Sequence, residues 1–333
     1  MKTTRTKQTS FMLIGLFSSF YSLSSISAPT VYIPLGSGNG IAAVDAATDK
    51  VIEHFTGVKN PHGLVATQDG EYLLAGSINE DAEKTKAGEE NNSSLFLVHP
   101  AHGHVMQTIP VAGWSHHQAI TPDGRYVLST HPTRNHVSVV DVQRGSQIKL
   151  IPTNNGPYYI LVTRDGKRAY VSNSGASTVQ EINTENWTVT RTINAGPSPE
   201  HMVLSKDENV LYVNNSRKGT LSLIPLNAPE DRQEVSIAES LHGLDISDDG
   251  KHLFISSKSE GKLIVFTPET GDKVTVPLSP NPYHLNTIPG TGKVYVSSRS
   301  EPTVWVIDQS SFKLINSFQL PAGEGHQMSI INQ

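Results

Sequence analysis

Short segments of alternating hydrophobic and polar residues, separated by polar turns, fill most of the sequence. Alternation of this kind predicts β-strands with one buried face. Many of the turns contain Asp-Gly, as at Asp123-Gly124 and Asp165-Gly166, a pair that favours tight hairpins. The strand after such a turn ends in an aromatic or aliphatic pair, such as Tyr170-Val171. The pattern therefore predicts an all-β protein built from consecutive hairpins.

One phrase recurs along the chain and defines a repeat. It reads PHGLVATQDGEYLL from Pro61, PYYILVTRDGKRAYVS from Pro157 and LHGLDISDDGKHLFIS from Leu241. Successive copies lie about 42 residues apart, and an insertion over residues 79–93 lengthens the first interval. Each copy holds four short antiparallel strands, which is the content of one propeller blade.

Counting the copies predicts a seven-bladed β-propeller. The 8 residues from His326 onward and the 34 residues from Ala28 to Pro61 together complete one more repeat. We therefore expect a strand from residues 326–333 to pair beside residues 29–35, so that both termini build the closing blade. Such closure leaves no free sheet edge.

The repeat resembles a known family, the YVTN-repeat or YncE-like seven-bladed propellers. The motifs that carry the resemblance are DGKRAYVSN from Asp165 and INTENWTVTRTI from Ile182, and it covers essentially all of residues 28–333. It implies the fold but leaves the function open, because such propellers serve as binding modules, scaffolds and enzymes.

Residues 1–27 have the layout of a secretory signal peptide. A basic head with Lys2, Arg5 and Lys7 precedes the apolar run FMLIGLFSSFYSL, which is too short to span a bilayer, and SSISA follows. We predict cleavage near Ser27. We expect the product to be a single propeller domain over residues 28–333, a soluble monomer in the periplasm or secreted.

Composition narrows the chemistry that this domain can perform. A net charge of −5 argues against nucleic acid as a partner. The absence of cysteine excludes disulfides, iron–sulfur clusters, thiolate zinc sites and cysteine nucleophiles. Fourteen histidines remain as the main candidates for chemistry.

Half of these histidines occupy the first two positions of the repeat, where the innermost strand of each blade begins. We call these seven the histidine ring: His62, His116, His117, His201, His242, His284 and His326. Equivalent positions of seven blades converge on one axis, and imidazole nitrogen suits copper and zinc. We predict a metal site at one mouth of the channel, with copper favoured in an oxidising, cysteine-free setting and zinc as the alternative.

A structural role in hydrogen bonding is the competing interpretation of the histidine ring. Adjacent residues of a regular strand also point to opposite faces, so both positions of a repeat can face inward only where the strand is irregular. A metal-free propeller that binds a ligand or a periplasmic partner protein, as YncE-like relatives do, is the alternative function.

The ring is also similar in pattern to the propeller domain of nitrous oxide reductase, where seven histidines, including an adjacent pair like His116-His117, hold copper. This chain lacks the second, cysteine-bearing copper domain, so the resemblance implies a metal site and not that reaction. More distant alternatives are a tetrapyrrole-binding propeller and a lyase, since Glu200-His201 is similar to the His–Glu pair of streptogramin lyases.

Other residues near the same mouth complete the candidate site. Three tyrosines fill ring positions that lack histidine, and turn arginines there could hold a small anionic ligand. The candidates for cofactor or ligand binding are Tyr158, Tyr159, Tyr283, Arg134 and Arg217. Glu200, Asp245 and Asp248 could pair with an imidazole. The insertion could be a lid or a surface loop, while His99, His102 and His104 are expected in a turn on the opposite face.

Overall fold

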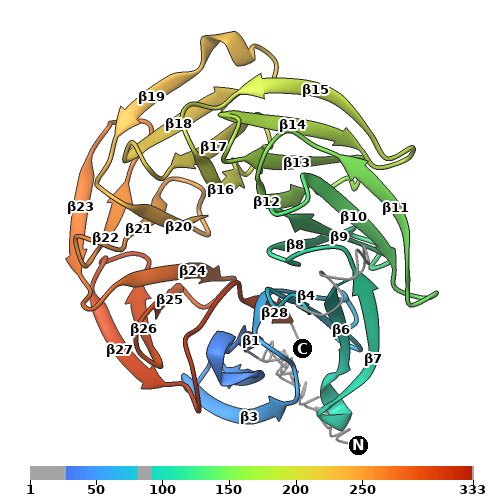
Figure 1. The fold of residues 1–333 in the computed structure, drawn as a ribbon. Helices are drawn as coiled ribbons and strands as arrows, with labels where there is room; N and C mark the ends of the chain where they lie inside the picture. The colour runs from blue at the N-terminus through green and yellow to red at the C-terminus, as the bar shows by residue number, and fades with distance from the viewer. Residues whose placement is uncertain (1–27, 82–91, 332–333) are drawn as a thin grey trace, which may run out of the picture.

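A computed structural model describes residues 28–81 and 92–331. Seven four-stranded antiparallel sheets stand around one axis, which confirms the seven-bladed β-propeller (Figure 1). The only helices in the described ranges are three short 3-10 turns, η1 (Gly36–Gly38), η2 (Pro100–His102) and η3 (Pro229–Asp231). The predicted signal peptide and most of the predicted insertion lie outside the described residues.

Six blades are continuous in sequence, and their strands run from the channel outward in chain order. They are β4 (Pro61–Ala66), β5 (Leu73–Ser77), β6 (Ser93–His99), β7 (His104–Val111); β8 (Gln118–Ile120), β9 (Tyr126–His131), β10 (His136–Asp141), β11 (Ser146–Pro152); β12 (Pro157–Val162), β13 (Arg168–Asn173), β14 (Thr178–Asn183), β15 (Thr188–Asn194); β16 (Pro199–Leu204), β17 (Val210–Asn215), β18 (Thr220–Pro225), β19 (Gln233–Ser236); β20 (Leu241–Ile246), β21 (Leu253–Ser257), β22 (Lys262–Phe266), β23 (Lys273–Pro277); and β24 (Pro282–Ile288), β25 (Lys293–Ser298), β26 (Thr303–Asp308), β27 (Leu314–Gln319).

The seventh blade joins the two ends of the chain. Its strands are β28 (Ser329–Ile331), β1 (Thr30–Pro34), β2 (Gly40–Asp45) and β3 (Lys50–Thr56). The innermost strand, β28, pairs antiparallel with β1, with Tyr32 opposite Ser329 and Thr30 opposite Ile331. The predicted composite blade is confirmed, and Figure 1 shows β28 beside β1.

The hydrophobic core lies between adjacent blades, where the side chains of neighbouring sheets pack against one another. Tyr170, Phe254 and Tyr295, the aromatic residues of the repeated second strand, are fully buried. Tyr170, for example, packs in one cluster with Met202 and Val213 of the next blade. Each blade thus uses the same repeat position to cover its neighbour, which explains why the phrase recurs so evenly.

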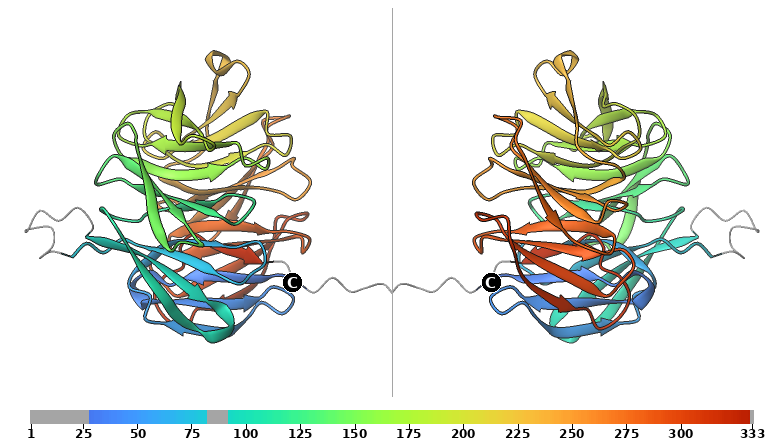
Figure 2. Two further views of the ribbon diagram at one scale, coloured as in Figure 1. Left: turned by 90° about the vertical axis from the view of Figure 1, so that its right-hand side faces the viewer. Right: turned by 90° about the vertical axis from the view of Figure 1, so that its left-hand side faces the viewer.

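The connections between strands lie on the two faces of the propeller, as the side views show (Figure 2). Because the strands alternate in direction, the entry to each inner strand shares a face with the turn between the second and third strands. We call this face the channel mouth. No helix in the described part of the chain is long and apolar enough to cross a membrane.

Candidate metal centre

The histidine ring lies where the inner strands begin, on six of the seven blades. His62, His201, His242 and His284 belong to β4, β16, β20 and β24. His116 and His117 lie just before β8, and His326 lies three residues before β28 begins. All seven side chains are buried, with exposed fractions from 0% to 7%. The structure therefore brings together every residue of the predicted ring.

A local irregularity explains how two adjacent residues of one strand both reach the channel. The backbone of His116 donates to the Thr130 carbonyl, and Thr130 donates back to the His117 carbonyl, so two residues oppose one. In β12 the pairing shifts in the same way at Tyr158 and Tyr159. A β-bulge bends the strand and changes the direction of its side chains. The side chains therefore do not alternate regularly between the two faces at these positions, and two adjacent ones can point into the channel.

The imidazoles pack against one another in a closed circuit around the axis. Successive ring centroids are separated by 4.9 Å (His62–His117), 5.0 Å (His117–His201), 4.4 Å (His201–His242), 4.7 Å (His242–His284) and 5.2 Å (His284–His62). His116 and His326 flank His62, at 4.1 and 4.3 Å. All seven rings thus form one contiguous cluster.

Many nitrogens of this cluster have no hydrogen-bond partner among the described residues. Both ring nitrogens of His62 and of His201 lack one, as do Nε2 of His117 and Nδ1 of His326. Buried polar atoms without a partner are rare in folded proteins. Several of them in one cluster leave nitrogens available to a ligand.

Burial keeps these imidazoles neutral. It lowers the pKa of all seven histidines, and protons on neighbouring rings would repel one another and lower the pKa of most of them further. The pKa of His116 falls to about 3. Only the neutral imidazole can bind a metal, so the ring is in its ligating form at neutral pH.

The nitrogens are close enough to share an ion. Three groups each offer one ligand atom per residue within 4.8 Å of the others: His62–His116–His117, His62–His284–His326 and His117–His201–His284. A fourth group with the same spacing contains a carboxylate: Glu200–His201–His242.

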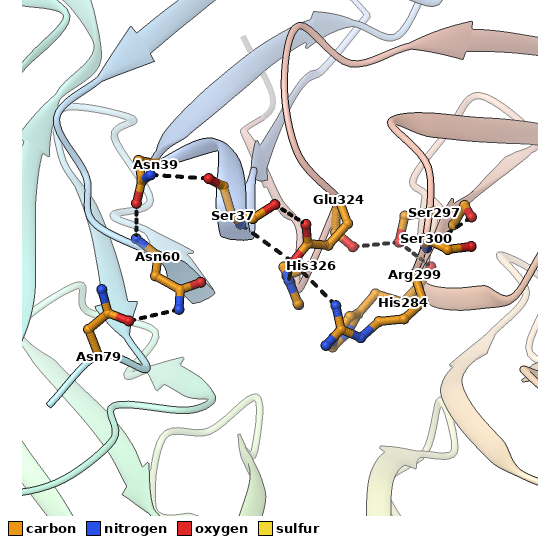
Figure 3. A network of polar contacts seen from close by, with 12 residues as sticks. Ser37, Asn39, Asn60, Asn79, His284, Ser297, Arg299, Ser300, Glu324 and His326 are labelled. Carbon is orange, nitrogen blue, oxygen red and sulfur yellow. Dashed lines mark hydrogen bonds and ion pairs between the residues drawn. The ribbon is translucent and has the colours of Figure 1, made fainter.

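Two carboxylates contact the ring from outside. Glu200 Oε2 lies 3.4 Å from Nδ1 of His242 on the next blade, and a carboxylate oxygen of Glu200 lies within 4.8 Å of a nitrogen of its chain neighbour His201. Glu324 Oε1 lies 3.2 Å from Nε2 of His326 (Figure 3). Sequence analysis did not single out Glu324. Asp245, which it did propose as an imidazole partner, instead accepts hydrogen bonds from Thr287.

The three predicted tyrosines lie against the ring. Tyr158 is 4.4 Å from His116 and Tyr159 is 4.8 Å from His201, between ring centroids. Tyr283 stacks on His242 at 4.0 Å with its plane tilted by only 8°. The tyrosines thus complete the aromatic lining where a repeat lacks histidine.

The two predicted arginines lie farther out on the mouth. Arg134 forms a 3.8 Å ion pair with Glu80 of the preceding blade. Arg217 lines a cleft of about 400 Å³ together with Lys218 and Lys258. The positive charge of Arg217 opposes the rise in the pKa of Glu200 that burial causes.

Two further cations, Lys258 and Arg299, contact an aromatic side chain of the site. Lys258 Nζ and the Arg299 guanidinium lie over the Tyr283 ring, at 5.6 and 5.1 Å from its centroid. Arg299 also contacts Glu324 at 3.2 Å, as Figure 3 shows. Partial burial is the main reason that the pKa of Lys258 is lowered.

The remaining histidines stay apart from the ring. His99, His102 and His104 lie around η2, in a turn between third and fourth strands, which places them on the opposite face as expected. His131 is buried but bonds to the Ser138 hydroxyl at 2.8 Å. These side chains have local structural contacts of their own.

The comparisons with known proteins show the fold. No family model matches the sequence, and no curated protein matches it significantly. Hydrazine synthase of Kuenenia stuttgartiensis is 21% identical over 75% of this chain and 76% of that chain, with a TM-score of 0.65. The periplasmic gluconolactonase PpgL of Pseudomonas aeruginosa is 16% identical over 92% and 99%, with a TM-score of 0.73. The dihydro-heme d1 dehydrogenase NirN, solved in complex with DHE, is 13% identical over 89% and 65%, with a TM-score of 0.65.

Proposed function

We propose that the protein binds copper or zinc through the histidine ring at the channel mouth, as a metal carrier or a simple metalloenzyme. The observation that carries this proposal is the set of unpartnered nitrogens on buried, neutral imidazoles spaced within 4.8 Å. A purely structural ring would be expected to satisfy its nitrogens internally. A bound ion would satisfy several of them at once.

Replacing His62 and His201 together with Ala tests this function. His62 belongs to two of the four groups and His201 to the other two, so the double variant leaves none of them complete. We expect metal binding to fall at least tenfold, measured by elemental analysis after loading with copper or zinc and removing free ion. The fold should persist, because the blades are held by cores outside the channel.

The matched control replaces His102 and His104 with Ala on the opposite face. This variant also removes two histidines, but it should bind as much metal as the wild type. Metal loss in the control with full binding in the ring variant would contradict the proposed function. Absence of any stoichiometric metal in the wild type after loading would favour the metal-free ligand-binding or interaction module.

We further propose that a small anion binds above the ring. Lys258 and Arg299 both lie over Tyr283, which stacks on His242, so an anion between these cations would lie at the channel mouth. Clefts lined by one sign of charge attract ligands of the opposite sign. Three further parts of the proposal rest on the sequence: the chain is exported to the periplasm, it is a monomer, and it has a partner protein there.

A tetrapyrrole is the competing ligand, and lyase activity is a more distant alternative function. The neighbour NirN was solved in complex with DHE, and this chain offers aromatic and cationic side chains at its mouth. Incubation with haem separates the two ligands: a stoichiometric Soret band that withstands gel filtration would favour the tetrapyrrole. Metal without pigment favours the histidine ring.

A further inference from the structure

The four groups of ligand atoms overlap in a way that limits how many ions they can hold. Any two of the all-histidine groups share a residue: His62, His117 or His284. Only one of them can therefore be filled when each residue gives one ligand atom. The group Glu200–His201–His242 shares no member with the two groups that contain His62.

We propose that the ring holds two metal ions, one on an all-imidazole group containing His62 and a second, divalent ion on Glu200, His201 and His242. This inference rests on the proposed function and extends it from a site to a pair of chemically distinct sites. The first offers only neutral nitrogen, whereas the second combines two nitrogens with a carboxylate oxygen.

The carboxylate is arranged to offer one oxygen as a ligand. Oε1 of Glu200 accepts a hydrogen bond from the Ser216 hydroxyl at 2.6 Å, which fixes the side chain. Oε2 has no hydrogen-bond partner among the described residues and faces Nδ1 of His242 at 3.4 Å. Both nitrogens of His201, whose side chain is buried, are also without a partner there. The group therefore presents unsatisfied oxygen and nitrogen toward one point.

Charge also favours a carboxylate at the second position. Two cations in neighbouring sites repel each other, and neutral imidazoles do not offset that repulsion. Glu200 supplies a negative charge in the group that does not contain His62. Carboxylate oxygen is also a harder ligand than imidazole, so this group selects a divalent ion such as Zn²⁺ over Cu⁺.

Zinc stoichiometry of the purified chain tests the inference. We expect two equivalents of Zn²⁺ in the wild type, measured by elemental analysis after loading and gel filtration. The near-isosteric Glu200→Gln variant removes the charge and should retain one equivalent. His242→Asn, a second variant that leaves the carboxylate in place, should also retain one. Near-ultraviolet circular dichroism would show that both variants are folded.

Asp245→Asn is the matched control. Asp245 is another half-buried carboxylate on an inner strand, but it bonds to Thr287 and belongs to none of the ligand groups found among the described residues. This variant should retain two equivalents. One equivalent in the wild type, or two in both Glu200→Gln and His242→Asn, would overturn the second site and leave the proposed function standing. No zinc or copper in the wild type would overturn both.

Discussion

Single imidazoles in this protein acquire their properties from their neighbours. His62 contacts four other rings of the cluster, and it has no hydrogen-bond partner among the described residues. Burial and the proximity of the other rings disfavour its protonated form. A histidine in this environment is a weak base and an available ligand, which is the combination that metal binding requires.

This environment predicts the pH dependence of the metal-free protein. The usual histidine pKa is 6.5, and that of His116 in the fold is about 3. Because the folded-state pKa is the lower one, the unfolded chain takes up protons first as the pH falls. Stability is therefore full above about pH 7 and decreases as the pH falls from about 6.5 toward 3.

Thermal unfolding between pH 7.5 and 5 measures this effect. We expect Tm to decrease steadily as the pH falls. Zinc affinity of the folded protein should change little over this range, because the lowered pKa values keep the imidazoles neutral. The His62→Ala/His201→Ala variant, which lacks two of the buried imidazoles, should show a shallower decrease of Tm. A Tm that is independent of pH over this interval would contradict the assignment of neutral, buried imidazoles.

Periodicity was sufficient to predict which histidines converge, since each occupies one of the first two positions of its repeat. It could not predict Glu324, because this residue lies one position before the repeat phrase, where other copies have Asn60, Ser198 or Ser240. It also could not predict that Glu200 contacts His242, because that contact joins two blades. Such contacts depend on how adjacent inner strands are placed, which a repeat pattern does not contain.

At the scale of elements, the inner strands are packed unusually close to one another beside the ring. An added Cβ on Gly243 would lie 2.5 Å from the carbonyl oxygen of Tyr283, and one on Gly63 would lie 2.7 Å from that of His116. Both glycines directly follow a histidine of the ring, His242 and His62. Glycine here allows the backbone of one bulged strand to approach the next.

Gly243→Ala should therefore move β24 away from β20. We expect a loss of about 1–3 kcal/mol in the free energy of unfolding, the range typical of overpacking. Zinc affinity should fall as well, because His284 moves with β24. Denaturation by urea and competition with a zinc chelator measure the two effects.

Gly271→Ala provides the comparison. Gly271 lies in the turn before β23, where an added Cβ would meet no atom within 4 Å, although its φ of +78° disfavours alanine. This variant should lose stability without any change in zinc affinity. Equal effects of both variants on zinc affinity would mean that the close approach of the inner strands does not position the ring.

The strands themselves were predictable, but their irregularities were not. Alternation and Asp-Gly turns give the four strands of each blade, because these features depend on neighbouring residues. The bulge at His116 and His117 is read from the hydrogen bonds of Thr130, a residue of the next strand. Sequence alone therefore left open whether both histidines of the pair face the channel.

At the scale of the whole molecule, closure depends on a short strand. β28 forms three residue pairs with β1 and also lies beside β4. Met328, just before it, is buried in the core cluster that includes Val31 and Tyr295. This small element completes the inner layer of the seventh blade.

Deleting residues 329–333 should expose the edge of β1 and open the propeller. We expect Tm to fall by several degrees and the variant to associate, because an unpaired strand edge is a template for pairing with another chain. Scanning calorimetry and light scattering measure these effects. Deletion of residues 332 and 333 alone, which retains β28, should leave both quantities unchanged, and an equal loss would show that β28 does not close the ring.

The contact between His62 and His326 determines when one of the ligand groups can form. Their rings are 4.3 Å apart in space, yet they are near opposite ends of the chain. The group His62–His284–His326 is therefore absent from any nascent chain that has not yet emerged in full. The proposed metal can bind at this group only after the last blade has formed, so the ion bound there is the one available where folding ends.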